Sequence, residues 1–266
     1  MSEKTKPAPV KKPFLTGSAV DRSTPAAALA FFGGLLLIAF LNLLLTTTLA
    51  GIGGRVIGVI LCVVQLGVYY LIFGYQGLSR GTAAVVRGEI QYRRRQEGKP
   101  VSEADRKLCY HPLKGFLIAL LGTLPLLILA VMYAVIVRRQ TYSVGALPSW
   151  VGNMRDRPDL LEPLTAYTTR VPAGFADILR IIIRTELMPL VSAVGSSNFD
   201  GLLLLERLSP VLVLLPGAAF GTGYLLGTRS RDQTHTDIRE GAKKRQRREL
   251  LRKRKAAQQR QPERLN

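Results

Sequence analysis

Four long apolar blocks constrain this chain more than any other feature of its sequence. The blocks cover 26–50, 56–75, 115–137 and 210–227, and the charged residues lie between the blocks rather than within them. A helix needs about 20 mostly apolar residues to cross the hydrocarbon core of a bilayer. The blocks therefore predict an all-α integral membrane protein with four transmembrane helices, of which the last is the shortest.

The blocks divide the chain into alternating apolar and polar segments. Ser209 and Pro210 suit the N-cap and first turn of the fourth helix, since serine hydroxyls cap helix starts and proline is tolerated there. We expect, in order, a basic N-terminal arm at 1–25, transmembrane helices 1–3 within 26–137 with a basic loop at 76–114, an external module at 138–209, the fourth helix at 210–227 and a polybasic tail at 228–266.

The distribution of lysine and arginine predicts the orientation. Of the 37 basic residues, 28 lie in the N-terminal arm, the 76–114 loop and the tail, which a four-span chain places on one side of the membrane. Basic loops stay in the cytoplasm. We therefore expect both termini in the cytoplasm and 138–209 outside, in a membrane such as the bacterial cytoplasmic membrane.

A fifth apolar segment, 175–194, carries charges that argue against a membrane span. A charge at the centre of a spanning helix costs about 3 kcal/mol on insertion scales. Asp177, Arg180 and Arg184 share one side of a helix, while apolar side chains cover most of the rest. We expect an amphipathic helix at the membrane surface or against the bundle, with a span or a packed external helix as alternatives. Glu206 has two candidate sets of partners, the arginines of this helix or residues beside it in sequence.

Two polar side chains fall at similar depths within the apolar blocks. Asn42 and Gln65 belong to the first and second blocks, which are joined by a short glycine-rich segment. An interhelical hydrogen bond between such residues contributes about 0.6–2 kcal/mol in a membrane. We expect this bond to form, with contact to a transported solute as the alternative.

The fourth block is rich in small residues at helical spacing. Small side chains let two helices approach closely in a membrane. We expect packing within this chain, with dimerisation as the alternative. The candidate packing residues are Gly217, Gly221, Gly223 and Gly227.

The tail contains the densest basic run, with ten lysines or arginines among the seventeen residues of 239–255. Such a run keeps the C-terminus inside, attracts anionic lipid headgroups at about 1 kcal/mol per charge, or binds the phosphates of RNA or ribosomes. The tail has no aromatic residue for base stacking, so sequence-specific nucleic-acid recognition is not expected. The candidate lipid- or phosphate-contacting residues are Lys243, Lys244, Arg245, Arg247, Arg248, Arg252, Lys253, Arg254 and Lys255.

No pattern of catalytic or cofactor-binding residues is present in the sequence. A nucleophile elbow, a phosphate-binding loop and an HExxH zinc motif are all missing. Cys109 and His111 supply two ligand groups, whereas a zinc site needs three or four. Cys62 and Cys109 do not form a disulfide framework. We therefore expect no enzyme activity, no cofactor and no bound metal.

Three functions are compatible with these features. We favour a non-enzymatic accessory or scaffold subunit that acts through a membrane-protein partner or as a homo-oligomer. The alternatives are a transporter or channel component, and a membrane biogenesis factor that holds ribosomes or anionic lipid by its tail. In tail and helix count the chain is similar to membrane-protein insertases. Those proteins are expected to carry a basic residue in a groove inside the membrane, where this chain has only Arg55 at the outer edge.

Overall fold

A computed structural model describes residues 11–138, 174–195 and 198–259 of the chain. Of these residues 84% are helical, and none of them forms a strand. Four helical stretches are long and apolar enough to cross a membrane: Thr24–Thr46, Val56–Gln96, Lys114–Ile136 and Phe199–Lys253. The prediction of an all-α protein with four such helices is confirmed.

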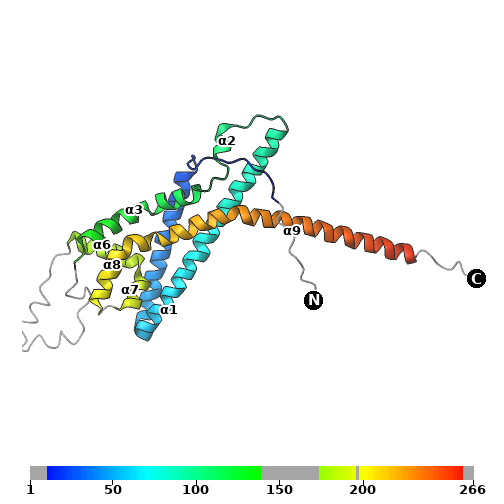
Figure 1. The fold of residues 1–266 in the computed structure, drawn as a ribbon. Helices are drawn as coiled ribbons and strands as arrows, with labels where there is room; N and C mark the ends of the chain where they lie inside the picture. Colours follow the sequence, from blue (N-terminus) through cyan, green and yellow to red (C-terminus); the bar gives the residue numbers. More distant parts are fainter. Residues whose placement is uncertain (1–10, 139–173, 196–197, 260–266) are drawn as a thin grey trace, which may run out of the picture. The chain divides into compact units, whose positions relative to one another are not determined.

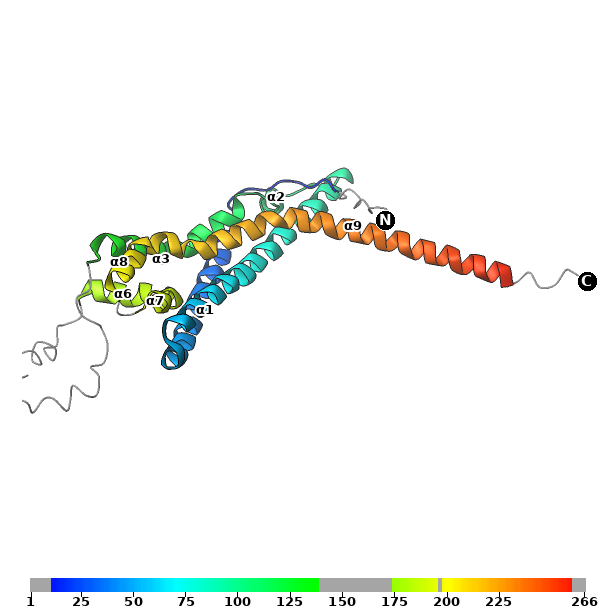
Figure 2. The same ribbon diagram turned by 60° about the horizontal axis from the view of Figure 1, so that its bottom comes forward.

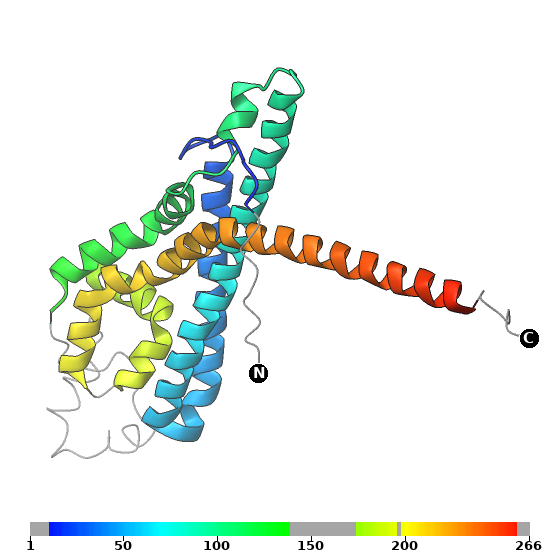
Figure 3. The same cartoon turned by 45° about the vertical axis from the view of Figure 1, so that its right-hand side comes forward.

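Seven helices follow one another along the described residues (Figure 1). They are α1 Thr24–Gln96, α2 Glu103–Lys107, α3 Lys114–Ile136, α6 Phe175–Glu186, α7 Met188–Val194, α8 Phe199–Val213 and α9 Leu215–Gln259. α1 contains the first two membrane-spanning stretches. Its ribbon folds back between them, so that they run in opposite directions (Figure 3).

The helices extend well beyond the apolar blocks. α1 continues to Gln96, so much of the segment 76–114, expected as a loop, is helical. α9 continues to Gln259, so the tail is helical as far as the structure describes it. Lysine, arginine, glutamine and alanine are good helix formers. A helix already nucleated in the apolar stretch therefore propagates through these residues at low cost.

The predicted helix start at Ser209 and Pro210 is wrong. α8 begins earlier, at Phe199, where the side chain of Asn198 accepts a hydrogen bond of 3.0 Å from a backbone amide of the first turn. Ser209 and Pro210 lie inside α8, and the break before α9 falls at Leu214. The apolar run alone did not reveal this start. The capping residue, Asn198, lies before Glu206 and Arg207, which interrupt the run.

The segment 175–194 forms two short helices rather than one. α6 and α7 are separated at Leu187, and Pro189 stands in the first turn of α7. A proline at this position is tolerated because its missing N–H would have no helical partner there, but it cannot continue a preceding helix. The placement of this segment at a membrane surface stays a prediction, and 139–173 of the expected external module lie outside the described residues.

The chain divides into two compact units. Unit 1 comprises Met1–Thr24, Phe73–Leu117 and Ala219–Asn266, and unit 2 comprises Pro25–Ile72 and Ile118–Ala218. Unit 1 therefore contains the N-terminal arm, the later part of α1 and most of α9. Unit 2 contains the most apolar parts of α1 and α3 together with α6, α7 and α8.

The core of unit 1 is aromatic. Tyr224 of α9 is 1% exposed and stacks on Tyr110, with ring centroids 5.4 Å apart and planes 7° apart. Phe14 packs edge-on against Tyr110 at 5.9 Å, and Ala84 and Val85 of α1 complete the cluster. Offset stacks and edge contacts of this kind stabilise aromatic pairs beyond the burial of their area. Phe14 thus anchors the described part of the N-terminal arm in the core of unit 1.

Unit 2 packs its helices closely and presents apolar side chains outward. A side chain added at Gly122 of α3 would collide with the Ala28 carbonyl and the ring of Phe31, which is 1% exposed. α6, α7 and α8 pack against one another (Figure 2). The exposed large residues of this unit include Leu29, Leu37, Phe40, Leu41, Ile60, Val63, Val131, Val135, Leu204 and Val211. Such an apolar exterior suits helices surrounded by hydrocarbon.

Candidate functional site

A buried cluster of charged side chains joins α6 to α8 in unit 2. Glu206 of α8 lies at its centre, with a side chain that is 2% exposed. Nε and Nη2 of Arg184 each lie 2.7 Å from the same carboxylate oxygen of Glu206, and Nε of Arg180 lies 3.5 Å from it. Of the two candidate partner sets for Glu206, the structure selects the arginines of α6.

Arg180 makes further contacts that complete this cluster. Its Nε donates a hydrogen bond of 2.8 Å to the Tyr133 hydroxyl, and its Nη1 lies 3.3 Å from Asp177. Burial by itself lowers the pKa of Arg180, but the hydrogen bond to Tyr133 and the carboxylates of Glu206 and Asp177 outweigh burial and raise it. The cluster therefore holds two guanidinium groups against two carboxylates and is formally neutral.

The surroundings of the cluster are apolar on the outside. Phe175, Ile178 and Ile181 of α6 are each more than half exposed, while Arg180 is 8% exposed. On α8, Leu208 is exposed while Glu206, two residues earlier, is buried. Ionisable groups that face inward beneath an apolar exterior are rare in membrane proteins and usually functional, because each is costly to hold away from water.

A second buried polar group lies on α6 and α1 of unit 2. Nε2 of Gln65 donates to the Tyr69 hydroxyl at 2.6 Å and lies 3.5 Å from the backbone carbonyl of Glu186. The Glu186 side chain makes no ion pair with any described residue, and burial raises its pKa to about 7. This carboxyl therefore exchanges its proton close to neutral pH.

The structure does not pair Asn42 with Gln65. The Gln65 amide is turned toward Tyr69, one turn along the same helix, and toward α6. The Asn42 Nδ2 atom is buried and has no hydrogen-bond partner among the described residues. Similar depth on adjacent helices was therefore not sufficient to bring the two amides together.

The four candidate packing glycines of α9 all lie against other helices. A side chain at Gly223 would collide with the backbone of Gly74, and one at Gly227 would collide with the backbone of Gly81. Gly221 faces the ring of Phe116 in the same way, and Gly217 has the Ala119 methyl 3.4 Å from its ideal Cβ position. We call the contact of 74–81 with 223–227 in unit 1 the glycine seam.

Two ion pairs in unit 1, one partly buried and one buried, link segments far apart in the sequence. Glu89 of α1 accepts hydrogen bonds from Nε and Nη2 of Arg231, the shortest at 2.8 Å, and lies 2.6 Å from Nε2 of His235. Lys114 pairs with Asp21, and both side chains are at most 5% exposed. Burial disfavours ionised Asp21, but hydrogen bonds from Lys114 and two neighbouring hydroxyls outweigh it and lower the pKa of this carboxyl.

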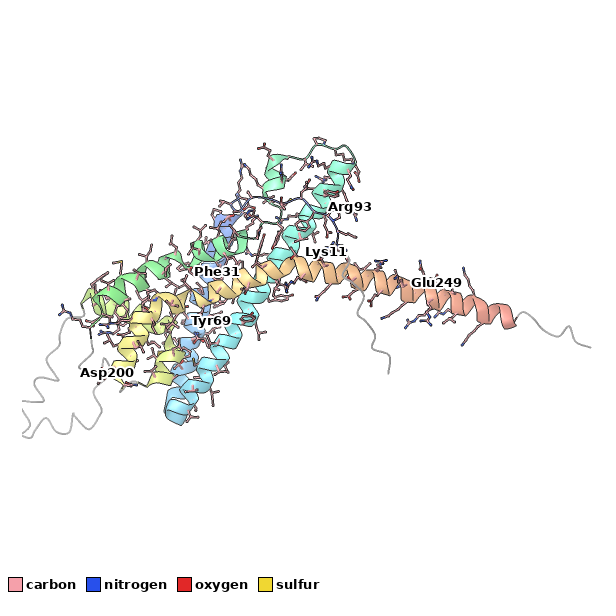
Figure 4. All side chains as sticks on the ribbon, viewed as in Figure 1. Lys11, Phe31, Tyr69, Arg93, Asp200 and Glu249 are labelled. Carbon is pink, nitrogen blue, oxygen red and sulfur yellow. The ribbon has the colours of Figure 1, made fainter. Side chains whose placement is uncertain are left out.

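The basic tail residues lie on the last part of α9, residues 239–259, which we call the arm. The arm extends away from the rest of unit 1 over ~30 Å, at 1.5 Å per residue, and its side chains project outward around Glu249 (Figure 4). None of its described lysines or arginines forms an ion pair with another described residue, and the Arg254 side chain lies outside the description. The exposed candidates are Lys243, Lys244, Arg245, Arg247, Arg248, Arg252, Lys253 and Lys255.

Comparison with known proteins gives no assignment. No protein-family model matches the chain, and neither a curated protein nor a solved structure matches it. The residues and contacts of the chain itself are therefore the basis for proposing a function.

Proposed function

We propose that this protein is a non-enzymatic integral membrane protein, an accessory or scaffold subunit that holds a polyanionic partner at the membrane through the arm. The observation that carries the proposal is the continuity of α9 from Leu215 to Gln259. A basic segment that only sets the orientation of a chain needs charge and no ordered structure. A continuous helix instead attaches the arm's cations firmly to the membrane-spanning part of α9.

The placement of cations around the arm favours a phosphate-rich partner in solution over a flat lipid surface. Successive helical residues project about 100° apart, so the cations at 243–245 alone face three directions. A helix lying on a bilayer presents one side to it. A ribosome or another RNA-bearing assembly offers phosphates whose neutralisation releases counterions. Because the arm has no aromatic ring, this binding does not depend on base sequence.

The orientation is part of the same proposal. Both termini and the segment 76–114 lie in the cytoplasm, and the segment between α3 and α8 faces outward, in a membrane of the bacterial cytoplasmic type. The supporting observation is the distribution of basic residues described above. α6 lies at the interface, with the exposed faces of Ile178 and Ile181 toward lipid.

Sedimentation of membrane vesicles tests whether the arm binds ribosomes. Vesicles carry the full chain, a chain ending at Ile238, or a chain with the eight exposed candidate cations from Lys243 to Lys255 replaced by glutamine. Ribosomes are detected by blotting at low and high salt. A matched control replaces Arg93, Arg94 and Arg95, the exposed basic residues at the end of α1, by glutamine. We expect ribosome recovery to fall about 10-fold or more in both arm variants and at high salt, and to be retained in the control.

Two outcomes would contradict this proposal. If both arm variants recover ribosomes as the full chain does, the arm does not dock them. If recovery depends instead on the content of anionic lipid, the arm binds the membrane and the scaffold function loses its support.

A second candidate function, a transporter or channel component, is favoured by the buried charges of unit 2. Glu186 has a pKa of about 7 and no charged partner among the described residues, and Glu206 of α8 is buried as well. Inward-facing carboxyls of this kind are typical of proton and ion pathways. Flux in vesicles containing purified protein tests it: transport that Glu186→Gln abolishes supports this function, and no flux across a broad panel of solutes excludes it.

A further inference from the structure

We propose that unit 1 carries a second anion site, separate from the arm, which binds the phosphate of a phospholipid headgroup. The site is a groove of about 600 Å³ between α1 and α9. Every polar side chain that lines it is a hydroxyl or a guanidinium, and no carboxylate does. These polar residues are Ser79, Thr82, Arg87, Ser230, Arg231 and Thr234.

The groove contains hydrogen-bond donors that are not used within the fold. Arg87 makes no ion pair with a described residue, and Ser79 and Ser230 form no side-chain hydrogen bond with one. By contrast, the hydroxyls of Thr82 and Thr234 donate to backbone carbonyls of their own helices. Phosphate oxygens only accept hydrogen bonds, and guanidinium–phosphate bonds are among the strong, charge-assisted kind. Two serines and an arginine therefore form a donor set that suits a phosphate.

Arg231, which lines the groove, is held in place by an ion pair. Its Nε and Nη2 atoms both bind the Glu89 carboxylate, which also contacts His235. This arrangement leaves Nη1 of Arg231 without a described partner. It also neutralises Glu89, so that its carboxylate does not repel an anion in the groove. Glu89 is thus a positioning residue for the site.

Apolar side chains next to the groove favour a phospholipid over free phosphate. One helical turn toward the apolar part of α1 from Ser79 lies Tyr75, which is 71% exposed. One turn before Ser230 on α9 lies Leu226, which is 44% exposed. A phosphate bound in the groove would therefore have exposed apolar surface beside it on both helices, as the acyl chains of a lipid require.

Native mass spectrometry of the full-length protein in detergent tests the site, because bound phospholipid is counted directly. The probe is phosphatidylglycerol at a fixed ratio to protein, with phosphatidylcholine and inorganic phosphate as separate additions. Arg87→Gln is compared with Arg80→Gln, which removes the same charge from an exposed arginine on the same helix outside the groove. The arm is intact in both variants, so its contribution to lipid binding cancels.

We expect Arg87→Gln to lower retention of phosphatidylglycerol about 10-fold, the effect of one lost charged hydrogen bond, and Arg80→Gln to leave it unchanged. The double variant Ser79→Ala with Ser230→Ala should lower retention by a smaller factor. Equal retention in the two arginine variants would overturn the proposal. If inorganic phosphate displaces the lipid completely, the groove takes free phosphate and the lipid assignment is wrong.

Discussion

The arginines of α6 and those of the arm carry the same charge in opposite surroundings. The side chains of Arg180 and Arg184 are 9% and 19% exposed, and both approach the Glu206 carboxylate. The arm arginines whose side chains the structure describes are exposed and make no ion pair with another described residue. A buried cation has lost its hydration and needs a carboxylate in the fold. An exposed cation keeps its hydration and remains available to a partner outside.

Removing the central carboxylate of the buried set should have the largest effect. Glu206→Gln leaves two guanidinium groups without their shared counter-charge, and removing one member of a buried ion pair costs about 3–5 kcal/mol. Thermal unfolding in detergent measures the loss of stability. Arg207→Gln, at the exposed next position of α8, is the control and should be close to neutral. A mild effect of Glu206→Gln would show that water reaches the cluster.

A substitution in the glycine seam tests whether close helix contact, rather than charge, holds α9 in unit 1. Gly223→Ala places a methyl group into the backbone of Gly74, and overpacking of this kind costs about 1–3 kcal/mol. Gly67→Ala is the control, since nothing lies within 4 Å of its new methyl group. That control should stabilise the helix slightly, because alanine has the higher helix propensity. Equal stability of the two variants would contradict the close contact.

The uncompensated Glu186 should give stability a pH dependence of opposite sign to that of the paired Asp21, whose pKa is lowered. Its pKa is raised from 4.5 to about 7, so the folded state binds more protons than the unfolded state between these values. Stability should therefore fall as pH rises through this window. Glu186→Gln should abolish that slope in thermal unfolding measured across the window. A slope that survives the substitution would have to come from another group.

The arm should contribute least to stability. Replacing the eight exposed candidate cations from Lys243 to Lys255 by glutamine should change the free energy of unfolding by about 0.5 kcal/mol or less, because no described residue loses a partner. Chemical unfolding of the full chain and the variant measures this. A larger change would show that the arm packs against the protein, and the contrast with α6 would fail.

The apolar blocks were sufficient to predict four helical stretches long and apolar enough to cross a membrane, because each stretch contains a long block without charge. The start of the fourth stretch was not predicted. Partners far apart in sequence were harder to predict. Glu206 had two candidate sets of partners, and only the packing of α8 on α6 selects Arg184. Gln65 was expected to bond to Asn42 because the two residues have similar depths in neighbouring apolar blocks. In the structure its amide nitrogen donates instead to the Tyr69 hydroxyl and lies near the Glu186 carbonyl of α6.

Helix ends were the other feature that sequence patterns placed poorly. The positive charges that follow the second and fourth apolar blocks were expected to mark a loop and a solvated tail, but these residues also favour helix and extend α1 and α9. Unit 1 shows a further limit. Gly74, Gly77 and Gly81 have a helical spacing that matches the glycines of α9, yet one spacing fits many helices, and only the fold identifies the partner.

Because α9 is continuous, the directions in which the arm's side chains point are fixed relative to the apolar part of the same helix. Between Gly227, fixed in the glycine seam, and Lys243 there is no break at which the helix could swivel. One inserted residue would turn every cation of the arm by about 100° relative to the seam, whereas a four-residue insertion would nearly restore the original directions. The direction in which each arm charge faces therefore depends on the number of residues between it and the glycine seam.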